Sequence, residues 1–261
     1  MNSKSLVLLA LISILSVSLV FAQNTLDDVK LFQNFLRDAP IAKTLFVDGG
    51  LEYSSYDGFS DLVIGAQGAY PLNEKLHIDG ALGFASRSYE NDNIDGQSGL
   101  TDLYVGGRYN LMEDDTKVSA GGYVTLPIGE EKAGYGSLNF GAYGALRHPL
   151  DNGMVITGTL GLDFVEVTTK SFDFQTGETE EESDYENSLT LAGGVIYPVN
   201  DQLAAVGELM LRTEYDFMML SGGADYTLEM GSKLRGALGI GLDDGAPDLM
   251  LMISFLHFFN Q

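Results

Sequence analysis

The feature that most constrains the fold is an alternation of apolar and polar residues with a period of two, which recurs from residue 44 to the end of the chain. In segment 76–84, the large apolar side chains share one face, while His77 and Asp79 lie on the other. Successive side chains of a β-strand point to opposite faces of the sheet, so this period predicts strands. Twelve segments carry it: 44–54, 60–70, 76–84, 103–111, 117–126, 138–146, 154–166, 188–197, 203–211, 218–228, 233–242 and 248–259.

The length of these segments points to a membrane. Most are close to the ~9–11 residues with which a tilted strand crosses a bilayer. After residue 22, the chain has no run of the ~18 apolar residues that a membrane helix needs. The sequence therefore predicts an all-β chain folded as a closed antiparallel transmembrane β-barrel of about twelve strands, with a short N-terminal helix.

The joints between the segments alternate in kind. Short polar turns fall at 70–74, 109–113, 148–153, 197–201 and 228–232. The other joints are more variable: those at 88–99, 127–137 and 167–187 are long, and those at 55–59, 215–217 and 243–247 are shorter. Short turns on one side and longer loops on the other are typical of an outer-membrane barrel, whose short turns are periplasmic. This pattern predicts a location in the bacterial outer membrane.

A soluble sandwich would show the same alternation, with its apolar face packed inward. Two features favour the membrane barrel. Glycine and alanine recur on both faces, which leaves too few large apolar residues to fill the ~10 Å core between two sheets. Tyrosines also fall on the apolar face near strand ends, where the aromatic girdle of an outer-membrane barrel lies. These are Tyr53, Tyr70, Tyr109, Tyr197 and Tyr226.

Two segments are expected before the barrel, which we assign to residues 43–261. Residues 1–22 have the pattern of a cleavable signal peptide: a positive start, an apolar run and small residues at the exit. Within residues 23–42, a helix is predicted over 25–38, because Thr25 and Asp28 can form a capping box and an apolar stripe follows. This helix would either plug the lumen or cap its periplasmic mouth.

The charge balance limits the partners. The formal net charge is −23, so phosphate backbones would be repelled and nucleic acid is excluded as a partner. Outer-membrane lipid and lipopolysaccharide are the expected surroundings. The final strand is rich in aromatic residues at 255–259, which resembles the signal that the barrel-assembly machinery recognises.

Two motifs in the middle of the chain resemble those of a known family. Gly99, Asp102, Gly106, Arg108 and Tyr109 form a G-x-x-D-x-x-x-G-x-R-Y strand, and the next strand ends in L-P-I-G at 126–129. This is similar to the transporter-like barrel family named for the meta-pathway of phenol degradation, whose usual second motif is L-P-T-G. The resemblance implies a barrel of the twelve-strand type that moves small solutes, including hydrophobic ones, with no defined substrate.

Catalysis is not expected. An outer-membrane phospholipase is the rival reading, but it needs a serine, a histidine and an orienting acid or amide at the outer rim. His77, His148 and His257 all fall near the predicted periplasmic end, and no G-x-S-x-G motif is present. The chain has no cysteine, and we expect no cofactor or metal site. The acidic run 178–184 could bind Ca²⁺ but is better explained as a solvated loop, because it lacks the spacing of a preformed site.

The lumen is the candidate functional site, because the polar face of the strands carries charges of both signs. The predicted lumen-lining residues are Asp48, Glu52, Asp79, Asp102, Arg108, Tyr143, Arg147, Asp163, Glu208, Arg212, Asp225, Arg235 and Asp243. They could line a narrow channel or transporter for a small solute, where the acidic excess would favour cations. They could equally form an ion-pair network that fills a non-conducting structural or surface-binding barrel.

Overall fold

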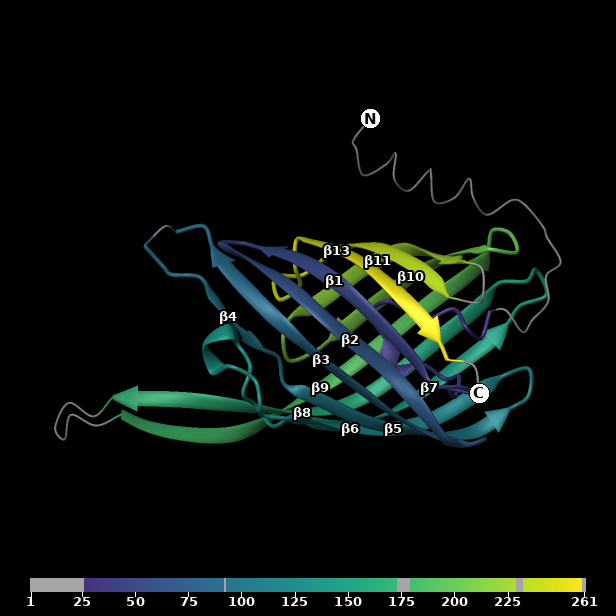
Figure 1. Cartoon of the computed structure of the whole chain (residues 1–261). Helices are drawn as coiled ribbons and strands as arrows, with labels where there is room; N and C mark the ends of the chain where they lie inside the picture. The colour runs from purple at the N-terminus through teal and green to yellow at the C-terminus, as the bar shows by residue number, and fades with distance from the viewer. Residues whose placement is uncertain (1–25, 92, 173–178, 229–231, 260–261) are drawn as a thin grey trace.

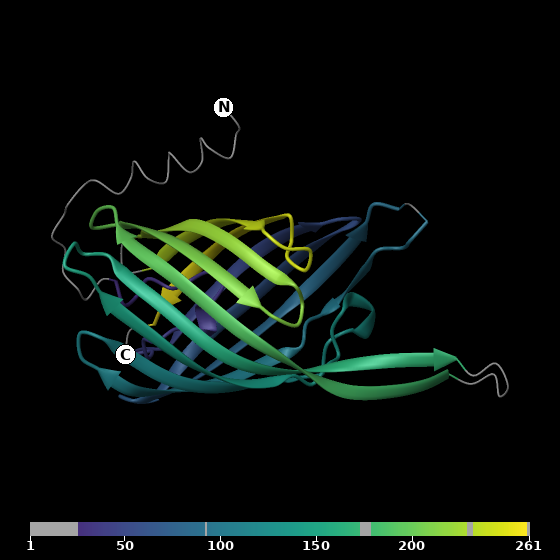
Figure 2. The ribbon, with the colours of Figure 1, turned by 180° about the vertical axis from the view of Figure 1, so that it is seen from behind.

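The computed structural model describes residues 26–91, 93–172, 179–228 and 232–259, without the side chains of 170–182. The signal peptide predicted at 1–22 lies outside the described residues. The chain forms one antiparallel sheet rolled into a barrel (Figures 1 and 2). Its strands are β1 (Phe46–Tyr56), β2 (Phe59–Asn73), β3 (Leu76–Tyr89), β4 (Gln97–Leu100), β5 (Leu103–Glu113), β6 (Lys117–Leu126), β7 (Phe140–Pro149), β8 (Val155–Phe172), β9 (Thr179–Pro198), β10 (Leu203–Arg212), β11 (Phe217–Thr227), β12 (Lys233–Gly241) and β13 (Leu249–Phe258).

The sheet closes because the first and last strands pair along most of their length. The register of β1 with β13 runs from Phe46 opposite Phe258 to Ser55 opposite Leu249. Short β4 pairs with residues 84–87 of β3, and β5 pairs with residues 76–81 of the same strand. β4 and β5 therefore occupy one position in the barrel. The result is the predicted closed twelve-strand barrel, in which every described strand except short β4 pairs on both sides.

Burial is inverted relative to a soluble protein. Large apolar side chains such as Ile64, Leu160 and Ile253 are more than half exposed on the outer face. Aspartate, arginine, serine and threonine side chains are buried on the inner face instead. Among the predicted girdle residues, Tyr70, Tyr109 and Tyr226 are exposed and Tyr53 and Tyr197 are half-buried. A polar interior behind an apolar outer belt excludes the soluble sandwich and is the pattern of an outer-membrane barrel.

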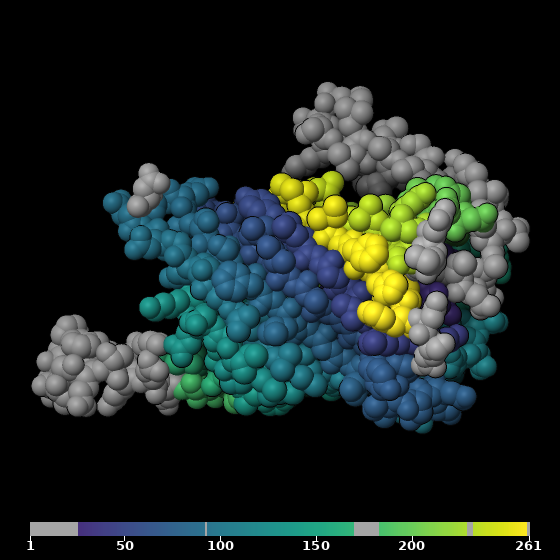
Figure 3. Space-filling view, viewed as in Figure 1, coloured from purple at the N-terminus to yellow at the C-terminus, as the bar shows by residue number. Residues whose placement is uncertain are grey.

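The two ends of the barrel differ as expected. One end carries tight turns, such as residues 74–75 and 114–116, and the other carries the longer loops and the short 3₁₀ helix η4 (Glu131–Ala133). Figure 1 shows the C-terminal end of β13 at the tight-turn end, which we assign to the periplasm. The space-filling view in Figure 3 shows β1, β2, β3 and β13 packed into a continuous wall. No helical segment of the described chain is long and apolar enough to cross a membrane.

The long loop predicted at 167–187 is a β-hairpin. β8 and β9 continue past the rim and pair with each other as far as Phe172 opposite Thr179. Their other neighbours stop earlier, at Phe164 on β8 and Thr190 on β9, so the extension stands clear of the barrel (Figures 1 and 2). The strands are predicted from the alternation of apolar and polar residues. Beyond the membrane this alternation is no longer required, so the sequence predicts a loop where β8 and β9 extend.

Candidate functional site in the barrel lumen

The lumen contains residues 26–42, which we call the plug. They contact arginines on β5 and β7 and, on the far side of the barrel, Glu208 on β10 and Arg235 on β12. Residues 26–42 therefore lie inside the barrel, in contact with opposite sides of its inner face. It continues into β1 at Phe46.

Apolar side chains of the plug pack into two clusters against the inner face. Leu26, Val29, Leu31 and Phe32 pack against small and branched residues of β8, β9, β10 and β12. Phe35 and Ala42 pack against Phe46, Ala69 and Leu256 near the seam where the barrel closes. Burial of these side chains favours docking by removing apolar surface from water.

The helix predicted over 25–38 is wrong. The described part, 26–38, consists of turns and one 3₁₀ turn, η3 (Phe35–Arg37). Barrel side chains form hydrogen bonds with backbone groups of the plug that would pair with one another in a helix. Arg147 donates to the carbonyls of Leu26 and Val29, at 3.0 and 2.7 Å. A helix would have to break these bonds, so the lumen environment overrides the local apolar period.

Two inward arginines hold the centre of the plug. Arg108 donates from Nη2 to the Leu36 carbonyl at 2.9 Å, and from Nη1 to the carbonyls of Asp38 and Pro40. Arg147 pairs with the Asp38 carboxylate, which also accepts the Ala39 N–H. Arg108, Arg147 and Asp38 are all at most 4 % exposed, so these charges are compensated almost entirely by protein groups.

Further polar contacts come from β7 and β8. The Tyr143 hydroxyl donates to the Leu36 carbonyl at 2.9 Å, and the Thr159 hydroxyl donates to the Arg37 carbonyl at 3.0 Å. The two donors, like the arginines above, bind main-chain oxygens of the plug. The lumen therefore recognises the path of the plug backbone as well as its side chains.

A second buried charge cluster surrounds Arg235 on β12. Arg235 Nη1 lies 2.7 Å from Asp48 Oδ2, and Nε lies 3.3 Å from Asp225 Oδ2. Lys233 also pairs with Asp225, at 3.0 Å. The same arginine donates to the carbonyls of Lys30 and Leu31 and lies over the rings of Phe32 and Phe35. It thus joins wall carboxylates, plug backbone and plug aromatics.

Glu208 on β10 binds the plug through its backbone N–H groups. Its two carboxylate oxygens accept from the N–H groups of Phe32, Gln33 and Asn34. Three converging donors compensate a carboxylate that is only 2 % exposed.

His77 and Asp79 on β3 form a buried pair beneath Arg108. The Ala42 N–H donates to His77 Nδ1 at 2.8 Å, so that nitrogen carries no proton. His77 Nε2 then bears the proton and lies 3.2 Å from Asp79 Oδ2. Arg108 Nη2 lies 3.8 Å from the same carboxylate oxygen.

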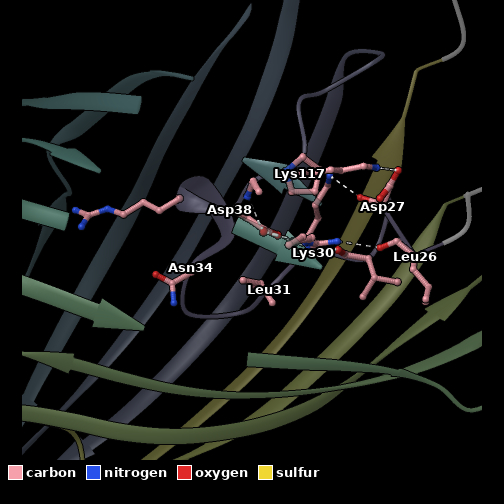
Figure 4. A network of polar contacts seen from close by, with 12 residues as sticks. Leu26, Asp27, Lys30, Leu31, Asn34, Asp38 and Lys117 are labelled. Carbon is pink, nitrogen blue, oxygen red and sulfur yellow. Dashed lines mark hydrogen bonds and ion pairs between the residues drawn. The ribbon is translucent and has the colours of Figure 1, made fainter. Parts of the chain in front are cut away.

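The periplasmic side of the plug is held more loosely. Lys117 pairs with Asp27, and both side chains are about one-fifth exposed (Figure 4). Lys30 donates to the Asp27 carbonyl at 3.3 Å and lies over the Phe46 ring. The pKa of Lys30 is lowered from its ordinary value of 10.5 to about 8, chiefly by burial and then by the positive charge of Arg147.

The outer side of the plug forms the floor of a chamber of about 320 Å³, which we call the outer chamber. Arg37 of the plug pairs with Asp163 at 3.1 Å and lies over the Tyr123 ring. Tyr123 stacks on Tyr104 with ring centroids 5.1 Å apart. Arg212 lines the same chamber and lies over the Phe217 ring.

Asp102 has a different role from the other predicted lumen residues. Its carboxylate accepts the backbone N–H groups of Gly129, Gly136 and Ser137, and so fastens the loop between β6 and β7. A side chain at Gly129 would meet Asp102 Oδ1 at 2.8 Å, and one at Gly99 would meet Glu130 Cγ at 2.1 Å. The two sequence motifs thus form a single structural unit at the outer rim.

Two other predicted residues stand apart. Glu52 is half-buried on the inner face of β1 and accepts a hydrogen bond from Ser54. Asp243 is exposed in the loop after β12, because the strand ends at Gly241. Asp243 therefore does not join the buried set.

Sequence reasoning missed the plug's own charged groups. Arg37, Asp38 and Lys30 were counted as part of a helix, although each makes central contacts in the lumen. The nearby hydroxyl of Thr190, which donates to Asp163 at 2.6 Å, was also missed. Residues 26–42 carry no strand pattern, and nothing local in them indicates a path across a barrel.

The remaining histidines stabilise periplasmic turns. His148 Nδ1 lies 2.7 Å from the Thr116 hydroxyl, and His257 Nδ1 lies 2.8 Å from the Ser232 hydroxyl. Within the described part of the chain, no three or more histidine and acidic side chains gather to hold a metal ion. The alternative of a Ca²⁺ site at 178–184 concerns residues whose side chains lie mostly outside the described part of the structure.

Comparison with known proteins decides the family. Residues 49–250 match the model of the family described as "Putative MetA-pathway of phenol degradation". The chain belongs to this family. The match spans β1 to the start of β13, which is nearly the whole barrel.

Solved structures share the architecture of this family member. An outer membrane channel from Pseudomonas putida F1 superposes with a TM-score of 0.65 at 15 % identity, covering 85 % of this chain and 98 % of that one. A mutant of the monoaromatic hydrocarbon channel TodX superposes with a TM-score of 0.52 at 10 % identity, covering 85 % and 93 %. The β domain of the Bordetella autotransporter BrkA gives 0.50 at 12 % identity, covering 83 % and 99 %.

These likenesses confirm the fold and, with the family and the exposed apolar belt, the location in the bacterial outer membrane. They include both channels and an autotransporter domain, so the architecture alone does not define the cargo. A comparison with curated proteins gave no match.

Proposed function

We propose that the protein is a small-solute channel whose resting state is closed by the plug. The supporting observation is that the plug lies between two spaces. The outer chamber of about 320 Å³ lies on one side, and a chamber of about 630 Å³ lined by Leu26, Asp27 and Lys117 opens at the periplasmic mouth. A barrel whose lumen served only as a packed core would not need spaces on both sides of one segment.

The way in which the plug is attached fits a gate. Many of its bonds join barrel side chains to plug backbone, including those from Arg108, Arg147 and Glu208. Each of these is a hydrogen bond to a charged group, which contributes about 1.5–3 kcal/mol net, so exchanging one for a bond to water costs far less than opening the closed sheet. The plug can therefore leave the path by exchanging contacts, without unfolding the wall.

The solutes that fit best are small and largely apolar. Phe35, Leu36, Tyr104, Tyr123 and Met210 supply an apolar lining to the outer chamber. A similar barrel, the TodX mutant, is a monoaromatic hydrocarbon channel, which supports a solute of this class here. Transport of this kind requires no catalytic step.

A second candidate function is a non-conducting barrel that binds a partner at the cell surface. The hairpin that extends beyond Glu166 and Leu189 favours it, because within its described part the two strands pair with each other and with no further barrel strand. Free edges of this kind can pair with a strand of another chain. In this case the plug would be a permanent part of the core.

A reversible lock distinguishes the two functions. Ala39 of the plug and Ala145 of β7 pack in one cluster, and the chain has no native cysteine, so Ala39→Cys with Ala145→Cys can tie the plug to the wall. In planar bilayers, we expect single-channel openings in wild type, none in the oxidised double variant, and recovery after reduction. Each single variant is a matched control that should behave as wild type under oxidant. Absence of openings in correctly folded wild type would support the structural alternative.

A further inference from the structure

Arg212, the last residue of β10, lines the outer chamber. The chain has six arginines, and the other five bond to carboxylates or backbone carbonyls. Among the described residues, the side chain of Arg212 makes no ion pair, and its Nε is buried without a hydrogen bond. Its guanidinium lies over the face of the Phe217 ring, 5.4 Å from the ring centroid.

The carboxylate of Asp163, which lines the same chamber, already has a full set of partners. Asp163 Oδ1 accepts from Tyr123 at 2.7 Å and pairs with Arg37 at 3.1 Å. Asp163 Oδ2 accepts from Arg37 at 3.1 Å and from Thr190 at 2.6 Å. Arg37 and Asp163 therefore neutralise each other, and Arg212 leaves the chamber with one uncompensated positive charge.

Other polar atoms of the same chamber are also unpaired. Gln33 Oε1, the Tyr104 hydroxyl and the Ser188 hydroxyl are buried without hydrogen-bond partners. Buried polar groups are normally satisfied, so several unpaired ones around a single space indicate a place where a polar ligand group can bind.

The rest of the lining suits a flat apolar body. Phe32, Phe35 and Leu36 form the floor, and the Tyr104–Tyr123 pair forms part of the wall. An apolar cavity of roughly 150 Å³ is enough for benzene, so a volume of about 320 Å³ accommodates one ring with a polar substituent. A guanidinium binds a carboxylate through two parallel hydrogen bonds.

We infer that the outer chamber is a binding site for small aromatic monocarboxylates, with Arg212 pairing with the carboxylate and the plug aromatics contacting the ring. This inference deepens the proposed channel function and rests on it for its biological meaning. It makes the solute an amphipathic acid rather than a plain hydrocarbon. The single unpaired charge sets the preference for one carboxylate.

The test uses the full mature chain in nanodiscs and two probes of similar shape, benzoate and neutral benzyl alcohol. Equilibrium dialysis against empty nanodiscs gives binding to the protein alone. We expect wild type to bind benzoate more tightly than benzyl alcohol. Arg212→Met should weaken benzoate binding about tenfold or more while changing benzyl alcohol binding less than about twofold, because a hydrogen bond to a charged group is the strong one lost. Arg212→Lys should retain part of the preference.

Arg87→Gln is the matched control, since it removes one positive charge from a residue paired with Asp61 near the outer rim. Heat-modifiable migration in gels verifies that each variant is folded. Equal benzoate affinity in wild type and Arg212→Met, or an equal loss in Arg87→Gln, would overturn the site.

The site and the channel can fail separately. Openings in planar bilayers without Arg212-dependent benzoate binding would leave the channel intact and refute the site. Arg212-dependent binding in a protein that never opens would support the site and refute the channel.

Discussion

At the scale of single residues, Arg235 joins the plug to the wall. Its guanidinium contacts two wall carboxylates, two plug carbonyls and two plug rings. It is only 1 % exposed, so water cannot replace a lost partner without entering the structure. The free energy of plug docking should therefore depend on this side chain more than on arginines near the rim.

Arg235→Met should lower the free energy of unfolding by about 3–5 kcal/mol, because removing one member of a buried ion pair leaves the other charge uncompensated. Asp48 loses its arginine, while Asp225 keeps Lys233. Denaturant titration of the detergent-solubilised barrel measures the loss. Arg87→Met serves as control, since the more exposed pair with Asp61 should contribute only about 1 kcal/mol or less. Equal losses in both variants would contradict a central role for Arg235.

The residue pattern predicts side-chain direction well and partners poorly. Alternation assigned Asp48, Asp163, Glu208 and Arg235 to the polar face, and these four are buried on the inside. It could not reveal that Asp163 pairs with Arg37, because that arginine comes from a segment outside the sheet. The expected acidic lumen is likewise largely offset by arginines and N–H donors, which only the folded chain brings together.

At the scale of elements, the plug carries a group that opposes its own burial. Lys30 is 6 % exposed, and its pKa of about 8 lies well below the usual 10.5. Below pH 8 the ammonium is charged in the folded and the unfolded chain, and the folded state bears the full desolvation cost. Between about pH 8 and 10.5, the unfolded chain binds more protons, so stability should rise with pH.

Lys30→Met should remove this pH dependence and stabilise the protein at pH 7 by up to about 3 kcal/mol. The informative quantity is the difference in unfolding free energy between variant and wild type, measured from pH 7 to 10.5. This difference should shrink as the pH rises from about 8 to 10.5, because the contributions of other titrating groups are the same in both proteins and cancel. A constant difference would show that Lys30 is charged throughout and that its burial is compensated.

Two elements escaped prediction for related reasons. The helix expected at 25–38 had the correct apolar period, yet side chains such as Arg147 bind its carbonyls one by one. The loop expected at 167–187 is a hairpin, because strand pairing can continue where no bilayer imposes alternation. Local pattern predicts an element only where local contacts decide its conformation.

At the scale of the whole molecule, closure and strand number followed from the sequence. Both depend on the period of two and on the spacing of turns, which every strand repeats. A wrong boundary in one segment therefore does not change the predicted number of strands. The contents of the lumen did not follow, since the plug is specified by contacts between residues far apart in the chain, such as the hydrogen bond from Arg235 to the Lys30 carbonyl across 205 positions. The distribution of charged residues between the lumen and the two mouths is also a property of the whole molecule.

The pairing of charges inside the lumen leaves the uncompensated acidic groups at the two mouths. At the outer rim, Asp57, Glu90, Asp216 and Asp248 are exposed; at the periplasmic end, Glu74, Asp114, Asp115, Asp151 and Asp201 are exposed. Acidic rims attract cations through the surrounding water. Salt screens such a field, because the Debye length falls from about 10 Å at 0.1 M to about 3 Å at 1 M.

Openings of the channel should therefore prefer cations at low salt and lose most of that preference at high salt. Reversal potentials under a KCl gradient, recorded at mean concentrations of about 0.1 M and 1 M, measure the change. A preference that persists at 1 M would place unpaired carboxylates in the narrow part of the path, contrary to the pairing seen around Arg37, Arg147 and Arg235. A preference for anions at high salt would instead show that, once the rims are screened, Arg212 governs passage through the outer chamber.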